Sequence, residues 1–362
     1  MTEQIGIRCA LMRGGTSKGA YFLASDLPED TAARDRVLLA VMGSPDPRQI
    51  DGVGGAHPLT SKVAVVSKSK RLGCDVDYLF LQIVPDKPIV SDAQNCGNIL
   101  AGVAPFAIER GLVAPAGERT TVRVHMVNSD SVAEVTVETP GGRVRYGGDS
   151  GGEVAIDGVP GRHAPVVQAF LDTEGSTCGS LLPSGQAVDV IEGVPCTLID
   201  NGMPVVVMPA ESFGLTGYED NAALDGNAAL RERLEAIRLI AGERMGLGDV
   251  RSQTVPKLTL VAPPREGGMI ATRTFTPFSL HASIGVLGAV TVATACLLDG
   301  TPGHALAQVP DGLVKRCDVE HASGRLTVEI ELDDTAGGLK LRRAALVRTA
   351  RLLMDGTVFV PA

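Results

Sequence analysis

The sequence predicts an α+β protein made of two pseudo-symmetric domains, each with strands and one enclosed helix. Two charge-free runs, residues 99–108 and 286–298, carry this prediction. Each run would be apolar on every side of a helix, which is typical of a helix enclosed by protein. Both runs are too short to span a bilayer. A length of 362 residues also favours two domains, each large enough for its own core.

Further segments recur in the same order in both halves. Residues 60–66 (Thr-Ser-Lys-Val-Ala-Val-Val) resemble residues 255–261 (Val-Pro-Lys-Leu-Thr-Leu-Val), and Arg13-Gly14-Gly15 has a looser counterpart in Asn201-Gly202-Met203. Each half therefore contains a glycine turn and strand, a strand headed by lysine, and then the enclosed helix. This order indicates an old duplication, and it predicts that the two helix N-termini face each other across a cleft.

Other elements follow from periodicity and turn signals. Amphipathic helices are predicted at residues 31–42, ended by Gly43, and at about 228–245. Pro105 is expected to kink the first enclosed helix, because proline removes a backbone donor. The Asp355-Gly356 pair between two apolar runs predicts a hairpin with a type I′ turn. Period-two patterns predict strands at 120–127, 133–138, 143–146 and 166–171, and further strands are predicted at 77–84, 196–199 and 204–208.

Composition excludes several classes of function. The net charge of −9 comes with no basic block, so a nucleic-acid partner is not expected. Seven scattered cysteines without a Cys-x-x-Cys pair indicate a reducing compartment and argue against disulfides and structural zinc. The N-terminus lacks an apolar signal region, which predicts a cytoplasmic protein without a membrane partner. The six histidines show no metal-ligand spacing, so we expect no metal.

A cysteine precedes the first enclosed helix, in Asn95-Cys96-Gly97-Asn98. The first turn of such a helix directs free N–H groups and the positive end of its dipole into the protein. These N–H groups need an anion or capping side chains, and Asn95 or Asn98 could cap only some of them. A cysteine at a helix N-terminus also favours the thiolate. Taken alone, a buried structural cysteine is still the better interpretation.

Three further segments carry polar groups that suit an anionic ligand. His281-Ala282-Ser283-Ile284-Gly285 leads into the second enclosed helix. The loop Arg13-Gly14-Gly15-Thr16-Ser17-Lys18-Gly19 is not a phosphate-binding P-loop, because the order is wrong and a strand follows. It could hold a carboxylate through N–H and hydroxyl donors, and a solvated β-turn explains it equally well. Lys62 heads an aliphatic strand after a glycine-rich approach.

Two helix N-termini with a lysine and a cysteine nearby suit proton transfer at a carbon next to carboxylates. The helix dipoles would hold the anionic groups and stabilise an enolate. A neutral lysine would remove a C–H proton that a neighbouring carbonyl or alkene makes acidic.

The chain resembles the 2-methylaconitate cis–trans isomerase family, essentially from end to end. The motifs that carry this resemblance are Arg13-Gly-Gly-Thr-Ser-Lys-Gly19, Asp51-Gly-x-Gly-Gly55, Leu59-Thr-Ser-Lys-Val63, Asn95-Cys-Gly-Asn98 and His281-x-Ser-Ile-Gly285. The resemblance implies a diaminopimelate epimerase-like fold of two domains, each a β-barrel-like sheet around a central helix. It also implies an N-terminal domain of residues 1–184 plus 345–362 and a C-terminal domain of residues 185–344. The active site is expected in the cleft between them.

Within this family, Asp200-Asn-Gly-Met-Pro204 and residues 347–352 (Val-Arg-Thr-Ala-Arg-Leu) are most similar to the 4-oxalomesaconate tautomerases, or Δ-isomerases. The resemblance implies a cofactor-independent isomerase that acts on a small tricarboxylate in bacterial breakdown of gallate and protocatechuate, which are lignin-derived aromatics. Isomerisation of 2-methylaconitate or methylitaconate stays open, as does a non-enzymatic small-anion binding protein. A homodimer is the oligomeric state to test.

A departure from the related racemases bears on the mechanism. Those enzymes place one cysteine on each central helix, whereas this chain has Cys96 at the first position and Ser283 at the second. A single base, Lys62, working by a 1,3-proton shift therefore fits better than a two-thiol inversion. The second proton comes from Lys62 or Cys96. The expected substrate-binding residues are Thr16, Ser17, Lys18, Asn95, Gly97, Asn98, Arg273, His281, Ser283, Ile284 and Gly285.

Overall fold

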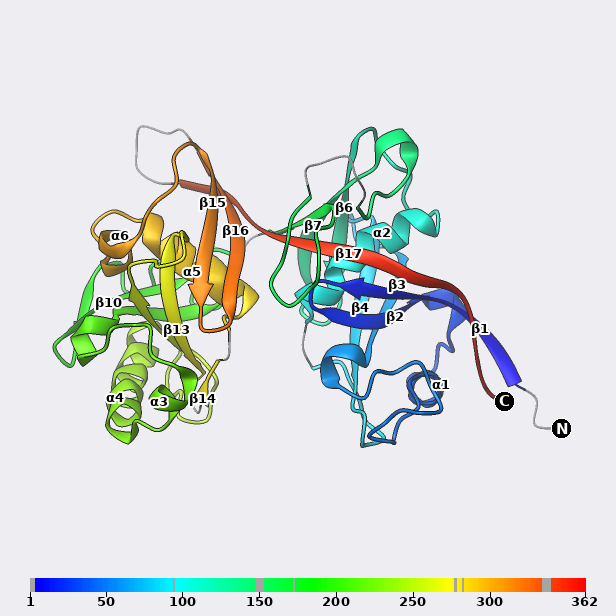
Figure 1. Cartoon of the computed structure of the whole chain (residues 1–362), viewed down its shortest axis with the longest axis horizontal. Coiled ribbons are helices and arrows are strands. Elements are labelled where there is room, and N and C mark those ends of the chain that lie inside the picture. Colours follow the sequence, from blue (N-terminus) through cyan, green and yellow to red (C-terminus); the bar gives the residue numbers. More distant parts are fainter. Residues whose placement is uncertain are drawn as a thin grey trace. The chain divides into compact units, whose positions relative to one another are not determined.

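The computed structural model describes residues 4–93, 95–147, 153–171, 173–276, 279–281, 283–333 and 340–362. The chain divides into two compact units (Figure 1). Unit 1 comprises Met1–Leu171 and Val347–Ala362, and unit 2 comprises Asp172–Leu346. Unit 2 thus begins before the boundary at residue 184 that the family resemblance implies. No helix among these described residues is long and apolar enough to cross a membrane.

Unit 1 is a sheet that closes on itself. Its strands are β1 (Gln4–Gly14), β2 (Ser17–Leu23), β3 (Lys62–Lys68), β4 (Val76–Ile83), β5 (Val90–Ser91), β6 (Arg119–Met126), β7 (Ser131–Glu138), β8 (Pro165–Phe170) and the second part of β17 (Lys340–Pro361). The pairs β2–β3 and β4–β6 are parallel, and β1–β2, β3–β4, β6–β7 and β7–β8 are antiparallel. Because β17 pairs with both β1 and β8, the strands form a closed, barrel-like ring.

The helix α2 (Gly97–Glu109) is the core of unit 1, as its charge-free sequence predicted. Every residue from Ile99 to Ala107 is buried, and strands β1 to β4 and β6 to β8 all contact the helix (Figure 1). It continues through Pro105. The opposite face of β1 to β4 is covered by α1 (Thr31–Met42), which ends at Gly43 as predicted. These strands therefore bury one face on α2 and the other on α1.

Unit 2 repeats this order. Its strands are β9 (Asp189–Ile191), β10 (Val194–Asp200), β11 (Pro204–Pro209), β12 (Lys257–Ala262), β13 (Ile270–Thr276), β14 (Ser279–Leu280), β15 (Val314–His321) and β16 (Gly324–Asp333). The pairs β11–β12 and β13–β15 are parallel, while β10–β11, β12–β13 and β15–β16 are antiparallel, as in the corresponding pairs of unit 1. The predicted pseudo-symmetry of the two domains is therefore confirmed.

The helices of unit 2 occupy equivalent layers. The second charge-free run forms α5 (Val286–Leu297), in which all residues from Gly288 onwards are buried. The amphipathic helix α4 (Ala228–Arg244) packs on the other face of the strands, through Leu230, Leu234 and Ile237. The short helices are α3 (Asn221–Asp225) and α6 (Pro302–Leu306), and the 3₁₀ turns are η1 (Ala24–Asp26), η2 (Pro58–Thr60), η3 (Pro140–Gly142) and η4 (Ala210–Phe213).

Two local predictions are wrong. Residues 143–146 form no strand. The hairpin predicted at Asp355-Gly356 is absent, because β17 runs unbroken through both residues. It pairs with β1 on both sides of this point, with Gly356 opposite Cys9 and Ala350 opposite Gly14. A long partner strand therefore overrides the local turn preference.

Gly14 is one of the positions where this packing requires glycine. A Cβ added there would lie 2.3 Å from the main-chain oxygen of Asn98 in α2. We expect Gly14→Ala to lower the free energy of unfolding by about 1–3 kcal/mol, because a buried main-chain group must move. Denaturant unfolding measures the change.

Gly356→Ala is the matched control, since that strand glycine has no neighbour within 4 Å of an added Cβ. It should leave stability unchanged or raise it by about 0.4–1 kcal/mol through the unfolded state. Equal losses for both variants would contradict the close approach of the β1–β2 turn to α2.

Candidate active site

Lys62 is the first residue of β3 and only 6 % exposed. It shares a strand face with Ala64 and Val66, which pack against α2, so its side chain lies on the inner side of the sheet. Its Nζ donates a hydrogen bond to Oε1 of Gln82, at 2.6 Å, and lies 5.1 Å from the centroid of the Phe80 ring. The Lys62 amine therefore lies on the α2 side of the unit 1 sheet, at one end of its strands.

Gln82 fixes the direction of that amine. Its Nε2 donates to the main-chain oxygens of Pro58, Ser61 and Ile83, so Oε1 faces Lys62. Because the hydrogen-bond partner of Lys62 is a neutral amide and not a carboxylate, a neutral Lys62 would leave no buried negative charge unpaired. When a neutral Lys62 donates one of its N–H groups to Gln82, its lone pair is not used in that hydrogen bond and can accept a proton.

Cys96 is the N-cap residue of α2 and is half-buried. No side chain among the described residues caps the N–H groups of the first turn. The hydroxyl of Tyr78 donates to the main-chain oxygen of Cys96. Burial first, and then the charge of Cys96, hold the pKa of Tyr78 well above its ordinary value, so it stays a neutral donor. Tyr78 and Phe80, two residues apart, lie on the same face of β4, and they contact the main-chain oxygen of Cys96 and the amine of Lys62 respectively.

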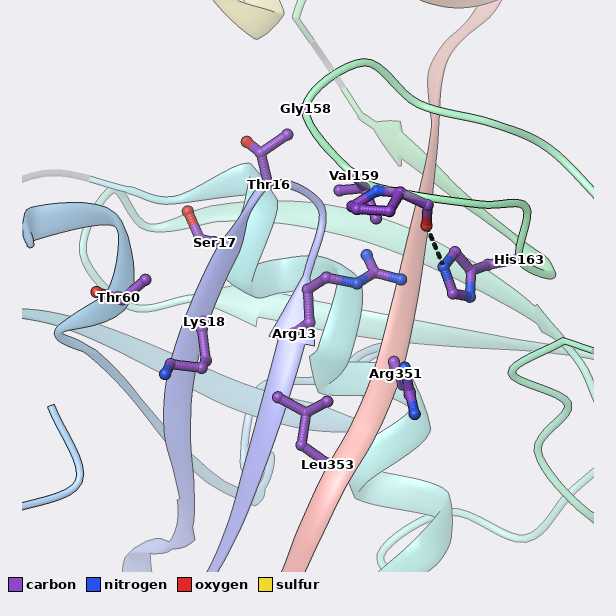
Figure 2. Close-up of a pocket in the computed structure, with 11 residues that line it drawn as sticks. Arg13, Thr16, Ser17, Lys18, Thr60, Gly158, Val159, His163, Arg351 and Leu353 are labelled. Atoms are coloured by element: carbon purple, nitrogen blue, oxygen red, sulfur yellow. Dashed lines mark hydrogen bonds between the residues drawn. The ribbon is translucent and has the colours of Figure 1, made fainter. Parts of the chain in front are cut away.

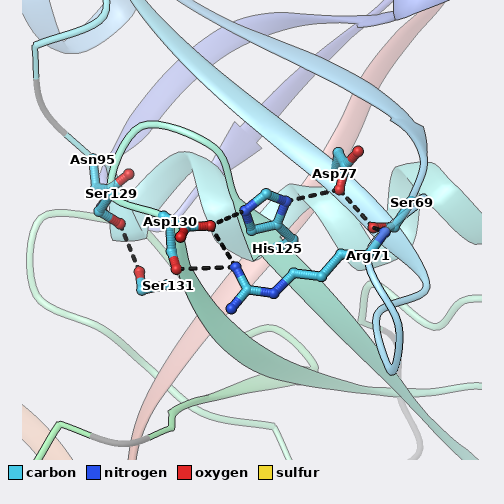
Figure 3. Close-up of polar contacts among 8 residues, drawn as sticks. All are labelled: Ser69, Arg71, Asp77, Asn95, His125, Ser129, Asp130 and Ser131. Carbon is cyan, nitrogen blue, oxygen red and sulfur yellow. Dashed lines mark hydrogen bonds and ion pairs between the residues drawn. The ribbon is translucent and has the colours of Figure 1, made fainter.

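Asn95 is hydrogen-bonded to the loop that joins β6 and β7 (Figure 3). Its Nδ2 donates to Oγ of Ser129, which in turn bonds Ser131. In the same loop, Asp130 accepts from Arg71 and bonds His125, whose other ring nitrogen contacts Asp77. These two contacts hold the pKa of the Asp130 carboxyl below its ordinary value. The exposed Asn95 thus bonds to a loop whose own side chains are held by hydrogen bonds.

The β1–β2 turn contacts the other side of the helix end. The Nδ2 of Asn98 donates to Oγ1 of Thr16 at 3.1 Å. Cβ atoms at Gly14 or Gly15 would collide with Asn98, and Gly15 has a positive φ of 50°. The buried Oδ1 of Asn98 and the buried Oγ of Ser17 have no partner among the described residues. Both are available to a ligand.

Lys18 takes a different position from Lys62. It shares a strand face with Ala20 and Phe22, which pack on the α1 side of the sheet. With Thr16 and Ser17 it lines a cavity of about 330 Å³ (Figure 2). That lining does not contain Lys62, Cys96 or Asn98.

Unit 2 has an equivalent helix end. Gly285 is the N-cap of α5 and no side chain caps the first turn. Ile284 is buried, and the amide of Ser283 donates to Nδ1 of His281 at 3.0 Å. Burial is the main cause that lowers the pKa of His281, although the Ser283 hydrogen bond opposes it, and Lys257 adds to the lowering. His281 is therefore neutral near pH 7, with Nε2–H as a donor.

Lys257 was not among the predicted site residues. It begins β12 as Lys62 begins β3, and burial lowers its pKa, with Arg238 as the second cause. Arg238 itself bonds the carbonyls of Val250 and Val255 in the segment before β12. Lys257 could have been predicted from the internal repeat in the sequence, because a lysine begins the corresponding strand in each half.

Arg273 does not join the other residues of unit 2. It lies on β13 opposite Leu260, on the face that packs toward α4. Its Nε donates to the carbonyl of Glu219, and its Nη1 donates to the carbonyl of Thr272. The described structure thus brings Thr16, Ser17, Asn95, Cys96, Gly97, Asn98 and Lys62 to one end of unit 1, and His281, Ser283, Ile284 and Gly285 to the α5 end of unit 2.

Comparisons with known proteins show which proteins the whole chain resembles. The model of the family described as PrpF protein matches residues 4–361. The chain is 63 % identical to the (4E)-oxalomesaconate Delta-isomerase of Novosphingobium sp. (strain KA1), over 97 % of both chains. It is 56 % identical to the 4-oxalomesaconate tautomerase of Pseudomonas putida, over 99 % of this chain and 97 % of the relative. A crystal structure of methylitaconate-delta-isomerase superimposes with a TM-score of 0.88 at 32 % identity, covering 99 % of this chain and 96 % of that one.

The neutral state of His281 gives a testable pH dependence. Because its folded pKa is lowered below the ordinary 6.5, its contribution to stability is present above about pH 6.5 and is lost as the pH falls through the folded value. NMR titration should place the ring midpoint below 6.5, and the Ser283 amide shift should follow it. His281→Gln identifies the signals, and a midpoint above 6.5 would contradict the buried neutral ring.

Proposed function

This chain belongs to the PrpF protein family, and we propose that it is an isomerase that shifts the double bond of 4-oxalomesaconate by a 1,3-proton transfer. Two relatives named for this substrate share 63 % and 56 % of their residues with it over nearly the whole length. The observation that carries the chemistry is Lys62, a buried amine bonded to a neutral amide beside the uncapped end of α2.

Lys62 is the general base. Its lone pair takes a proton from the methylene that lies between the keto group and the double bond of the substrate. The electron pair of that C–H bond passes into a dienolate, and Lys62 becomes an ammonium. Gln82 accepts a hydrogen bond from Nζ in both states, so the amine keeps its direction through the cycle.

The dienolate is reprotonated at the far alkene carbon by the Lys62 ammonium or by the Cys96 thiol. Either donor returns one proton for the one removed, so no cofactor is needed. A single amine can serve both carbons because they are two atoms apart. Ser283 occupies the position where the racemases carry a second cysteine, which argues against inversion by two thiols.

The helix ends hold the carboxylates of the substrate. No described side chain caps the first-turn N–H groups of α2 and α5, and the positive end of each dipole favours an anion. In unit 1, Asn98 and Ser17 add polar atoms that lack a partner among the described residues. In unit 2, His281 and Lys257 add donors next to α5. That both ends serve one substrate remains a prediction.

The alternative substrates are less well supported. The 3-methylitaconate isomerase of Eubacterium barkeri shares 35 % identity with this chain, well below the two oxalomesaconate enzymes. We place the reaction in the bacterial degradation of gallate and protocatechuate. The seven cysteines, all free thiols, support a reducing, cytoplasmic location. Exchange of substrate C–H protons with D2O would exclude a non-catalytic binding protein.

Lys62→Met tests the general base. It should lower kcat by about 10²–10⁴-fold, because no other base replaces the amine, while substrate still binds. ¹H NMR of 4-oxalomesaconate in D2O follows both turnover and deuterium uptake. Lys68→Met on the same strand is the control, since Lys68 is exposed and bonds only the carbonyl of Leu112. Wild-type exchange in Lys62→Met would end the proposal.

Lys257→Gln tests whether unit 2 contributes a carboxylate contact. We expect KM to rise about tenfold with little change in kcat, because a charged hydrogen bond is lost equally in ground and transition states. Lys315→Gln on β15 is the control and should leave both constants unchanged. An unchanged KM would mean that Lys257 does not bind substrate.

A further inference from the structure

Gln49 is a buried polar residue in the segment between α1 and β3, which the proposed mechanism does not use. Its side chain belongs to a residue only 2 % exposed. Its Oε1 accepts hydrogen bonds from the amide of Ala56, at 2.8 Å, and from the hydroxyl of Ser61, at 2.6 Å. Its Nε2 donates to Oγ of Ser44 at 3.1 Å. Because both ends of the amide have partners, the direction of Oε1 is fixed.

The glycine motif at residues 51–55 lets the chain lie directly against this amide. A Cβ added at Gly54 would lie 2.3 Å from Oε1 of Gln49 and 2.5 Å from the main-chain oxygen of Met42. Gln49 itself has a φ of 46°, which is unfavourable for a residue that has a Cβ. Such a backbone conformation persists only where the surrounding contacts impose it, and it is common near functional sites. The segment is therefore built to hold the Gln49 amide in one place.

Ser61 connects Gln49 to the general base. It immediately precedes Lys62 in the chain and is completely buried. Its main-chain oxygen accepts hydrogen bonds from Nε2 of Gln82, at 3.0 Å, and from the amide of Ile83, at 3.1 Å. Oε1 of the same Gln82 accepts from Nζ of Lys62. The position of Ser61 therefore sets both the start of β3 and the amide that directs the lysine.

We propose that Gln49 is a positioning residue for Lys62 and acts on it through Ser61 and Gln82. This inference rests on the proposed function of Lys62 as the general base. Proton removal from carbon needs the reacting atoms about 3–3.5 Å apart, and a displacement of about 1 Å can lower the rate about 10²-fold. Gln49 lies behind the base and away from the helix ends that hold the substrate in the proposed function. Its loss should slow the chemical step without weakening substrate binding.

Gln49→Met tests the proposal, because methionine is of similar length and has no amide. We expect kcat for 4-oxalomesaconate to fall about tenfold while KM stays within about twofold of the wild-type value. Unchanged kcat, or a loss that appears in KM alone, would overturn the positioning role.

Gln49→Glu is the conservative variant and should restore most of the rate lost in Gln49→Met. A carboxylate oxygen still accepts from the Ala56 amide and the Ser61 hydroxyl, and the hydroxyl of Ser44 can donate to the other oxygen. A loss of kcat as large as that in Gln49→Met would show that these hydrogen bonds do not set the rate.

A double-mutant cycle tests whether Gln49 acts through Ser61. The Ser61 hydroxyl also lies 2.9 Å from the main-chain oxygen of His57, so Ser61→Ala removes two contacts and should lower kcat at least as much as Gln49→Met. The double variant should be no slower than Ser61→Ala alone, because both changes break the same connection. Losses that multiply would contradict this connection.

Thr139→Val is the matched control for general damage to unit 1. Thr139 is completely buried, donates to the main-chain oxygen of Gly117 and bonds the hydroxyl of Thr120, so it holds a loop as Ser61 does. The variant should lower the Tm of thermal unfolding about as much as Gln49→Met does, but leave kcat unchanged. A matching loss of kcat in Thr139→Val would reduce the effect of Gln49 to stability alone.

Lys62→Met separates a failure of this inference from a failure of the proposed function. If Lys62→Met loses turnover and Gln49→Met does not, the positioning role alone is wrong. If Lys62→Met keeps wild-type exchange in D2O, the general base is another group, and the positioning role is wrong together with the proposed function.

Discussion

Within the part of the chain that the structure describes, no side chain caps the first-turn N–H groups of the enclosed helix α2, and the rest of unit 1 is arranged around that end. Its neighbours approach closely because they carry glycine where a Cβ would collide. Gly14 and Gly15 let the β1–β2 turn contact Asn98, and Gly19 lets β2 lie against the main chain of Lys62. The N-terminus of α2, the Lys62 amine and the Cys96 thiol therefore lie at the same end of unit 1.

The two units repeat the scaffold but not the chemistry. The turn at Asn201 and Gly202 is tied to α5 by hydrogen bonds from Asn201 to Thr291 and Thr294, just as Thr16 is tied to α2 by Asn98. Unit 1 places a thiol before its helix, whereas unit 2 places Gly285 there. The proposed reaction fits this asymmetry, because it uses one thiol in unit 1 and needs only an anion-binding helix end from unit 2.

The sequence was most informative where structure follows from local composition. Both enclosed helices were predictable because a run without charge cannot face water on any side, and the lysine-headed strands were visible as a repeat. The hairpin at Gly356 was mispredicted because the pairing of β17 with β1 joins residues more than 300 positions apart. Gln82 was missed for the same reason: its neighbours are set by strand register, which a single sequence does not display.

The β1–β2 hairpin places cationic or polar groups on both of its faces, although the chain as a whole has a net charge of −9. Alternation along β2 sends Lys18 to one face and aligns Gly19 with Lys62 on the other. The two-residue turn at Gly15 and Thr16 therefore bonds to groups on both faces, to Arg13 on one side and to Asn98 on the other. The local charge at this hairpin is decided by which groups the strand register brings together, and the net charge of the chain does not predict it.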